Sequence, residues 1–252
     1  METITSRENA KIKYACAVRD SEKQRAADGL FFAEGPKLCL ELAKSCTPRA
    51  MYATAAALAK TPELAQFDPA EIAPHVAEKL SGTKSNQGVF ALFETPVPPA
   101  DTLDTARRIL MLEGVQDPGN VGTIIRTADA AGLDGVLLSN QCADVFSPKV
   151  LRATMGSIFR MNLRTTDDLP GELTKLREKG YSILSSQLDG TPFYERQGVA
   201  ECFALIIGNE GNGVSEQVQQ TATHRVRLPM RGGAESLNAA IAAAIMMYEL
   251  MR

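Results

Sequence analysis

The stretch that decides the fold is DPGNVGTIIRTA, residues Asp117–Ala128, which comes shortly after the apolar run Ile109–Leu112. Pro-Gly-Asn is a turn signal, and Asn120 can cap a helix expected over residues 121–131. The order of strand, polar turn and helix is typical of α/β proteins, whose strand-end turns bind ligands. Taken alone, the stretch also fits an ordinary connecting turn followed by a solvated Arg126.

The same alternation of apolar runs and helical patterns continues to the C-terminus. We expect strands at residues 109–112, 135–138, 157–163, 181–185, 203–207 and 226–228, and helices at residues 121–131, 147–155, 173–179 and 236–251. Strands that alternate with helices predict a mostly parallel sheet that is covered on both faces.

A proline-rich seam, Glu94–Asp101, precedes this alternating region. Closely spaced prolines cannot continue a helix or a central strand. We therefore expect a domain at residues 1–95, a linker at 96–106 and a second domain at 107–252. The smaller first domain also has an α/β pattern, with a helical segment at 9–25, strands at 30–35 and 89–93, a helix opened by Pro36, and alanine-rich helix broken by prolines within 52–80.

Composition limits the class of protein. The chain has 252 residues, of which 44% are hydrophobic and 23% charged, the balance of an ordinary soluble protein. Its apolar runs are shorter than the ~18 residues of a membrane span, and the polar start, Met1–Asn9, predicts no secretory signal. Five cysteines without a C-x-x-C spacing and only two histidines predict reduced thiols in a cytoplasmic protein with no metal site.

Two further polar segments follow later strands. Gly208–Ser215 has the glycine spacing of a P-loop but lacks its lysine, so NTP binding would lack a phosphate counter-charge. We expect instead a loop whose backbone approaches a ligand closely, with Glu210 projecting into it. In Leu228–Asn238, Ser236 can cap the last helix, and Met230 can offer an apolar wall to a flat ring.

The charge distribution is uneven. A net charge of −3 argues against a uniformly basic nucleic-acid binder. Residues 147–164, however, hold four basic and no acidic residues, and residues 1–25 hold six basic and four acidic ones. Such an excess of basic residues is usually a solvent-exposed face. The alternative interpretation is a surface that contacts phosphates.

Together and in this order, the three polar segments resemble the motifs of the SpoU family of RNA ribose 2′-O-methyltransferases, within the SPOUT superfamily. The first motif resembles Asp117–Ala128, the second Leu205–Gly211, and the third Leu228–Met230 with Ser236–Asn238. The resemblance covers about residues 107–252. One departure is Ala239-Ala240, where many members carry a β-branched residue and a serine, so the subfamily is left open.

The N-terminal region resembles the L30e-like substrate-binding domain of members that modify ribosomal RNA, through Ile4–Ser6, Lys23–Arg25 and Phe31–Gly35. As a whole, the resemblance implies a C-terminal SPOUT α/β-knot, with a deep trefoil knot and a mostly parallel sheet. It also implies S-adenosylmethionine as the cofactor and an obligate homodimer. The apolar closing helix, with Leu237, Ile241, Ile245 and Tyr248, fits plain core or a helix packed against a partner subunit.

The resemblance also assigns the site residues. Arg126 is similar to the family's catalytic arginine, which deprotonates the ribose 2′-hydroxyl or orients it; a free arginine pKa above ~12 makes the first role demanding. Around the target nucleotide it places Asn120, Glu210, Ser236 and Asn238, and against the cofactor Gly208, Asn209, Leu228, Met230 and Leu237. For RNA contacts we expect Arg7, Lys11, Arg25, Lys149 and Arg152.

The sequence therefore predicts methyl transfer from S-adenosylmethionine to a ribose 2′-hydroxyl in RNA, with 23S ribosomal RNA favoured by the N-terminal domain. The alternatives are a tRNA 2′-O-methyltransferase, a non-catalytic RNA-binding protein that keeps the fold, and a generic nucleotide-binding α/β enzyme. The presence of Arg126 and Asn238 argues against the non-catalytic protein. The missing P-loop lysine argues against the generic enzyme.

Overall fold

The computed structural model of the chain describes residues 3–83, 86–97 and 103–252. It divides into two compact units, the first formed by Met1–Val97 with Asp144–Phe159, and the second by Pro98–Ala143 with Arg160–Arg252. A segment from the middle of the expected second domain therefore folds as part of the first unit. The expected linker falls partly on residues 98–102, which lie outside the described residues.

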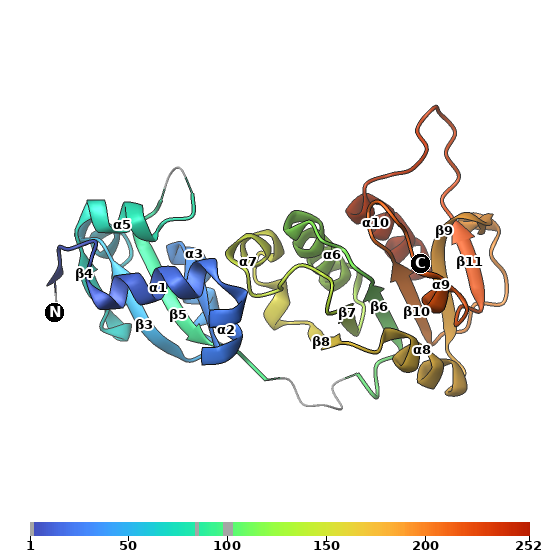
Figure 1. The fold of residues 1–252 in the computed structure, drawn as a ribbon, viewed down its shortest axis with the longest axis horizontal. Coiled ribbons are helices and arrows are strands. Elements are labelled where there is room, and N and C mark those ends of the chain that lie inside the picture. The colour runs from blue at the N-terminus through green and yellow to red at the C-terminus, as the bar shows by residue number, and fades with distance from the viewer. Residues whose placement is uncertain (1–2, 84–85, 98–102) are drawn as a thin grey trace. The chain divides into compact units, whose positions relative to one another are not determined.

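The first unit is built on a five-stranded mixed sheet with the order β1-β4-β3-β5-β2; strands β3, β4 and β5 are labelled in Figure 1. Strand β5 pairs antiparallel with β2 and β3, whereas β4 pairs parallel with β1 and β3. The elements are β1 Thr3–Ile4, α1 Ala10–Asp20, α2 Glu22–Asp28, β2 Leu30–Glu34, α3 Pro36–Leu42, β3 Pro48–Ala53, α4 Ala55–Lys60, η1 Pro62–Phe67, β4 Ala70–Ile72, α5 Pro74–Leu80, β5 Val89–Glu94, α7 Pro148–Thr154 and η2 Ser157–Phe159.

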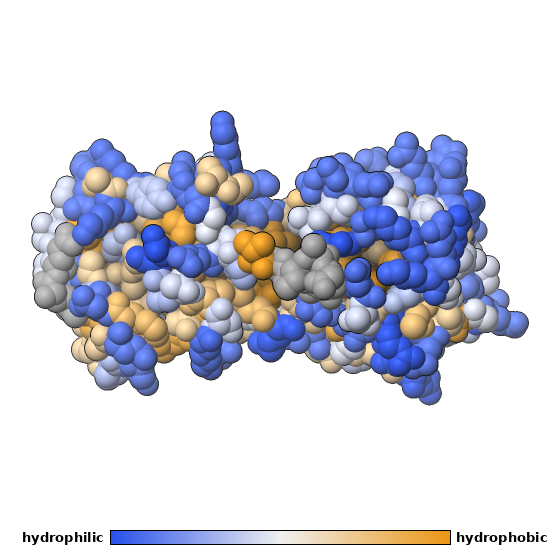
Figure 2. Space-filling model, turned by 90° about the horizontal axis from the view of Figure 1, so that it is seen from below, coloured by the Kyte–Doolittle hydropathy of each residue, from blue (hydrophilic) through white to orange (hydrophobic). Residues whose placement is uncertain are grey.

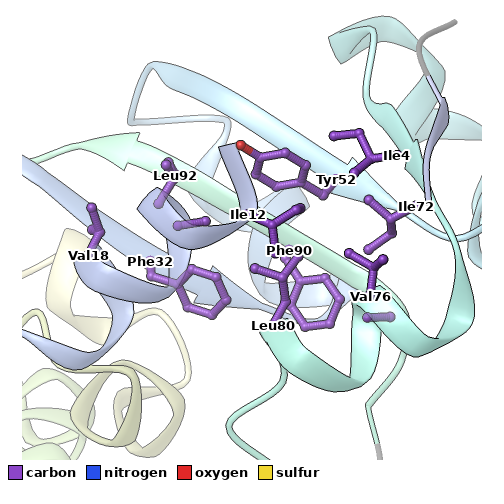
Figure 3. Close-up of a cluster of buried hydrophobic side chains, with 12 residues drawn as sticks. Ile4, Ile12, Val18, Phe32, Tyr52, Ile72, Val76, Leu80, Phe90 and Leu92 are labelled. Atoms are coloured by element: carbon purple, nitrogen blue, oxygen red, sulfur yellow. The ribbon is translucent and has the colours of Figure 1, made fainter. Parts of the chain in front are cut away.

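The core of this unit lies between the sheet and helices α1 and α5 (Figure 3). Helix α1 turns Ile12 and Val18 inward, at the spacing of one helical face. They pack with Phe32 and Phe90, whose ring centroids are 6.0 Å apart. These aromatic side chains are fully buried, and large rings of this kind bury much apolar area in a core.

The sequence prediction was wrong for one helix of this unit, and it missed several of its strands. The expected single helix over residues 9–25 is two helices, because Ser21 is extended and its side chain accepts a hydrogen bond from the Gln24 N–H, which starts α2. Strands β3 and β4 were missed, since alanine-rich sequence at residues 52–80 suggested only helix. Prolines do open α3 and α5, at Pro36 and Pro74, which confirms the predicted helix start at Pro36.

The second unit contains a six-stranded sheet with the order β11-β9-β10-β6-β7-β8, in which every ladder is parallel. This confirms the predicted mostly parallel sheet, while the knot stays a prediction. The elements are β6 Arg108–Leu112, α6 Pro118–Ala131, β7 Gly135–Ser139, β8 Asn162–Thr166, α8 Leu169–Glu178, β9 Ser182–Pro192, η3 Phe193–Glu195, β10 Phe203–Ile207, α9 Glu216–Gln219, β11 His224–Arg227 and α10 Ala239–Leu250.

The central strands β6 and β10 position the polar segments. Nearly every residue of both strands is buried, as parallel strands covered on both faces require. Leu112 pairs with Ile207 at the carboxyl ends of these strands. The loops that leave β6 and β10 therefore start side by side at one edge of the sheet.

Several boundaries here differ from the expected ones, including β9, which continues to Pro192, and α8, which begins at Leu169. The strand expected at residues 157–163 is a 3₁₀ turn followed by β8, because Met155 and Gly156 turn the chain with φ values of 49° and 88°. Helix α6 begins at Pro118 with Asp117 as its N-cap, although Asn120 was expected to cap it. Helix α10 begins at Ala239 with Asn238 as its N-cap, although Ser236 was expected there.

The surface is largely hydrophilic on the face shown in Figure 2, with hydrophobic residues scattered between charged ones. Among the described residues, no helix is both long enough and apolar enough to cross a membrane.

The aromatic core of the first unit gives a stability prediction. Phe90→Ala removes a fully buried ring that contacts Phe32, so the free energy of unfolding should fall by about 3–5 kcal/mol. Urea unfolding followed by circular dichroism measures the change. Val97→Ala is the control, because Val97 is 90% exposed and should change the unfolding free energy by less than about 0.5 kcal/mol. Equal effects of the two changes would contradict the assignment of the core.

Candidate active site

The loop from β6 to α6 is fixed by polar contacts to its own helix and to the neighbouring strand. Gly114 has a φ of 62°, the left-handed region that favours glycine. Its N–H donates to the hydroxyl of Ser139, a buried residue at the end of β7, over 3.0 Å. The Asp117 carboxylate accepts from the Asn120 N–H at 2.8 Å and so caps α6. The loop therefore presents the start of α6 in a defined position.

The loop that follows β10 folds back on itself. Asn209 and Gly213 exchange two backbone hydrogen bonds of 3.0 and 2.9 Å. A Cβ atom on Gly208 would lie 2.3 Å from the carbonyl carbon of Gly213, so only glycine fits there. The Asn209 side chain accepts from the N–H of Gly211 and donates to the Gly114 carbonyl over 2.8 Å. Asn209, expected to contact a cofactor, thus ties the β10 loop to the β6 loop.

Three residues from distant parts of the chain form one chain of hydrogen bonds. The Asn120 amide donates to Glu210 Oε1 over 2.9 Å. The Asn238 amide donates to Asn120 Oδ1, also over 2.9 Å. The Asn238 oxygen accepts from the Ala240 and Ile241 N–H groups and so starts α10. The contact joins all three polar segments in one site.

The carboxylate of Glu210 is held in its charged form. Burial alone raises the pKa of Glu210. Hydrogen bonds from the Asn120 side chain and from backbone N–H groups, including those of Gln116 and Asp117, outweigh this effect and hold the pKa below its usual value of 4.5. Donors that favour a carboxylate lower its pKa in this way. Glu210 is therefore an anion at neutral pH, and it acts as an acceptor rather than as an acid.

The remaining expected site residues border this cluster or lie along the same loops. Leu228 and Met230 are half-buried after β11, and no backbone hydrogen bond involves either of them in the part of the chain that the structure describes. Their backbone groups can therefore pair with a ligand beside an apolar wall. Ser236 and Leu237 are exposed on the long loop between β11 and α10, which projects in Figure 1.

Arg126 lies on the exposed side of α6, later in the helix than Asn120. Within the described ranges, the structure gives its guanidinium no hydrogen bond or ion pair. The structure therefore brings Asn120, Glu210 and Asn238 together, and it leaves Arg126 available on the same helix as Asn120.

The five residues expected to contact RNA have different surroundings. Arg7, Lys11 and Lys149 are exposed, although Arg7 also pairs with Glu78 at 2.7 Å. Arg152 is partly exposed and faces Glu34 at 3.7 Å. Arg25 is only 7% exposed, and its guanidinium binds Asp144 at 2.6 Å. Arg25 therefore serves the interior of the first unit, and we do not include it in an RNA-binding surface.

Ion pairs within the second unit account for two of the four basic residues in 147–164. Arg160 binds Asp129 over 2.6 Å, and Arg164 binds Glu172. These arginines neutralise carboxylates of neighbouring helices, so they are largely occupied within the unit. The phosphate-contacting interpretation is thus restricted to Lys149 and Arg152.

Sequence reasoning missed Glu113, the residue that follows β6. Its carboxylate accepts from the Ser215 N–H at 2.8 Å and from the Ser215 hydroxyl at 2.5 Å. Glu113 so holds the far end of the β10 loop against the β6 loop. Its position directly after a buried strand was the only sequence signal for this role.

The polar groups of the site are suited to holding and orienting a ligand. The central cluster of the site holds the Glu210 carboxylate and the amides of Asn120 and Asn238, and the helix that carries Asn120 also carries the exposed Arg126. Among residues 3–83, 86–97 and 103–252, no group of three or more His, Cys, Asp or Glu side chains could hold a metal ion. Such an arrangement can hold a hydroxyl-bearing ligand beside a flat, largely apolar one.

Comparisons with known proteins agree with the sequence motifs. The model of the SpoU rRNA Methylase family matches residues 107–248, and that of the MRM3-like substrate binding domain matches residues 9–91. A relative from Bacillus subtilis, named 23S rRNA (guanosine(2553)-2'-O)-methyltransferase RlmP, is 35% identical over 260 residues, which cover 99% of this chain and 99% of the relative.

Two solved structures resemble nearly the whole chain. An AdoMet-bound rRNA methyltransferase from Sinorhizobium meliloti has a TM-score of 0.84 at 28% identity, covering 99% of this chain and 97% of that one. The SpoU methyltransferase AviRb from Streptomyces viridochromogenes, in complex with AdoMet, has a TM-score of 0.83 at 27% identity, covering 97% of each chain.

The pKa of Glu210 gives a prediction with a defined sign. Because the folded-state pKa is lowered, the carboxylate stabilises the joined loops fully above the unfolded-state pKa of about 4.3, and this contribution is lost as the pH falls through the lower folded-state pKa. A carboxyl-detected NMR titration should give Glu210 a midpoint below 4.5, the usual value for a glutamate side chain. Glu210→Gln should lower the free energy of unfolding at pH 7 by about 0.5–1.5 kcal/mol.

Glu63→Gln is the matched control, because Glu63 is an exposed glutamate on η1 in the first unit. It should leave both stability and the pH profile unchanged. A Glu210 midpoint above 4.5 would contradict the hydrogen-bonded carboxylate, whatever the stability of the variant.

Proposed function

Because the chain belongs to the SpoU rRNA methylase family, we propose that it transfers a methyl group from S-adenosylmethionine to a ribose 2′-hydroxyl of RNA. The observation that carries this proposal is the hydrogen-bonded chain of Asn120, Glu210 and Asn238. It joins three motifs that lie far apart in the sequence, which a non-catalytic RNA-binding protein would not need to keep together.

The RNA is 23S ribosomal RNA. The Bacillus subtilis relative, similar over the full length, carries that activity in its name, and residues 9–91 match a substrate-binding domain. We assign substrate binding to residues 1–95, a linker to 96–106 and methyl transfer to residues 107–252. An enzyme of ribosomal RNA works where that RNA is made and assembled, in the cytoplasm.

The residues present fit the cofactor. Gly208 keeps the β10 loop tight, and Leu228 and Met230 offer unused backbone groups beside apolar side chains, the pattern of a site for a flat adenine ring. Leu237 is partly exposed beyond them. S-adenosylmethionine supplies an electrophilic methyl group on a positively charged sulfur. The contribution of the protein is to align the hydroxyl with that group.

The residues of α6 align the ribose hydroxyl. Arg126 orients the ribose hydroxyl and an adjoining phosphate, since a guanidinium donates several hydrogen bonds in a fixed plane. Asn120 and Asn238, held by the Glu210 anion, fix the target nucleotide, and Ser236 adds a hydroxyl from the long loop. The hydroxyl proton would pass to solvent water as the oxygen takes the methyl group, so Arg126 need not be a strong base in the resting site.

The RNA approaches through exposed cations. Arg7 and Lys11 lie on the first unit, and Lys149 and Arg152 lie on α7, which also belongs to that unit. Their number is small, so phosphate contacts position the RNA, and shape and base contacts must select it.

The active form is a homodimer that uses α10. Leu237, Ile241 and Tyr248 are 38%, 52% and 56% exposed, which leaves a row of large apolar side chains uncovered at and along this helix. Helix α10 packs on α6 through its other side. A second copy that covers this row would bury apolar area beside residues of the site, since Asn238 caps the same helix.

The decisive experiment measures transfer of a labelled methyl group to 23S ribosomal RNA from cells that lack the gene. The wild-type protein should label ribose. Arg126→Ala should reduce the rate by about 100-fold or more, because one orienting donor is lost at the reacting hydroxyl. Affinity for S-adenosylmethionine, measured by calorimetry, should stay unchanged.

Arg177→Ala is the control, because Arg177 is an exposed arginine on α8 without a proposed role. Ribose that stays unlabelled by the wild-type protein, while RNA binding is retained, would refute the enzymatic function. Normal labelling by Arg126→Ala would refute only the role of Arg126.

The dimer has its own prediction. Ile241→Asp places a charge in the exposed row of α10 and should shift the protein from dimer to monomer in sedimentation equilibrium, because an unpaired charge is costly in an apolar interface. Leu188→Asp is the control, since Leu188 is 76% exposed but lies on β9. A wild-type monomer, or a dimer that survives Ile241→Asp, would contradict the proposed interface.

A further inference from the structure

The segment Asp144–Phe159, which we call the docking segment, lies within the sequence of the methyltransferase region but folds with the first unit. The chain leaves the second unit after Ala143 and returns to it at Arg160. The chain thus passes from one unit to the other at both ends of this segment.

A buried ion pair fixes the start of the docking segment. Arg25 Nη2 lies 2.6 Å from Asp144 Oδ2, with 8% and 15% of the two side chains exposed. Arg25 Nη1 donates to the carbonyls of Val18 and Arg19 at the end of α1, both over 2.8 Å. The other Asp144 oxygen accepts from the Phe146 N–H over 2.8 Å. Every polar group of this pair is therefore satisfied, a condition for a stable buried pair.

An aromatic cluster holds the segment at two further points. The ring of Phe31 lies 5.3 Å from that of Phe146 and 5.7 Å from that of Phe159. Phe31 is fully buried, and these two rings from the docking segment cover it. Detachment of the segment would expose both Phe31 and the Arg25 guanidinium to water, which favours the packed arrangement.

A shared carboxylate links the middle of the segment to a loop of the first unit. Glu34 accepts from the hydroxyls of Ser81 and Thr83, over 2.6 and 3.0 Å. Arg152 of α7 faces the same carboxylate at 3.7 Å. Movement of α7 therefore changes the charge around Glu34 and the loop that Glu34 holds.

Both flanks of the docking segment are anchored to the site. Before it, the Ala143 N–H donates to the carbonyl of Val115 in the β6–α6 loop, over 2.9 Å. After it, Arg160 binds Asp129, one helical turn beyond Arg126 on α6, over 2.6 Å. The two ends of the segment thus reach the two ends of the helix that carries Asn120 and Arg126.

We propose that the docking segment couples the RNA-binding unit to α6, and that Asp144 and Arg25 are positioning residues for methyl transfer. RNA held by the first unit, including Lys149 and Arg152 on the segment itself, fixes α6 through the two flanks and so aligns Arg126. The inference rests on the proposed methyl transfer to RNA. It assigns Arg25 an internal role in the reaction instead of an RNA contact.

Asp144→Asn tests the coupling, since it removes the charge and keeps the shape. The variant should lower kcat on a ribosomal RNA fragment by about 10–100-fold, because small displacements of a reacting group have effects of that size. The KM for RNA and the Kd for S-adenosylmethionine should change little. In the free protein, hydrogen exchange should accelerate over residues 147–154 and also over residues 113–120.

Two matched variants separate coupling from plain stability. Glu201→Gln breaks the Arg107–Glu201 pair, which is also 2.6 Å long but more than half exposed on both sides, and it should change neither kcat nor exchange. The double variant Arg25→Met/Asp144→Leu replaces the buried pair by apolar volume, which is often neutral for stability. It should restore docking, slow exchange and normal kcat.

Several results would overturn the inference. In one such result, the Asp144→Asn variant exchanges hydrogen faster in the docking segment, but its kcat and its exchange over residues 113–120 stay unchanged. Another is a double variant that docks normally but keeps the low kcat. If Asp144→Asn fails to fold, Phe146→Ala loosens the segment through the aromatic cluster, and the same measurements apply. A wild-type protein without methyl transfer would refute the proposed function, whereas the exchange data would still decide whether the segment and α6 are coupled.

Discussion

The Glu210 carboxylate joins the loops of the site. It lies in the loop after β10, and it accepts hydrogen bonds from groups in the loop after β6 and in the first turn of α6. The β10 loop that carries it is closed by Gly208 and Gly213 and tied by Asn209 to Gly114. Glu210 can therefore reach the first turn of α6, and through Asn120 it reaches the start of α10. Without a carboxylate there, the Asn120 amide would lose its acceptor, and the Asn238 amide would donate to a side chain that is no longer held in place. The parallel pairing of β6 with β10 is what makes the contact geometrically available.

The sheet and the site thus depend on each other in a specific order. Burial of β6 and β10 on both faces fixes the register that places Leu112 opposite Ile207. The register in turn fixes where the polar loops begin, and the loops then use backbone N–H groups and amides to hold one anion. A pKa below the usual range follows, since the donors were arranged by the strands before any ligand arrives. Preorganised polar groups of this kind need no rearrangement when a substrate binds, which is how an enzyme can gain rate from alignment alone.

The parts of this arrangement that the sequence predicted are those governed by local chemistry. Buried strands, the alternation with helices and the motif segments have periodic or compositional signals, and the resemblance to the SpoU family is confirmed over residues 107–248. The parts it missed depend on partners far away in the chain. Asp117 caps α6, whereas the side chain of Asn120, the expected cap, donates to Glu210. Asn238 caps α10 in place of Ser236 and also contacts Asn120. Competition between two good capping residues is decided by such tertiary contacts, and no window of sequence contains them.

The arginines show most clearly how little the sequence predicts here, because the role of each arginine depends on the residue that its guanidinium contacts. Arg25 and Arg160 look alike in sequence as members of basic stretches, yet both are bound to aspartates that join distant segments. Arg126 has the same charge and lies on an equally regular helix, but it faces solvent on the helix that also carries Asn120. The net charge of −3 is compatible with the proposed RNA binding for this reason: several arginines are paired with carboxylates within the fold, and only a few exposed cations are proposed to contact phosphates. An enzyme with so few phosphate contacts must obtain its selectivity from shape and from base contacts, and the precise placement of α6 then matters more than the total charge.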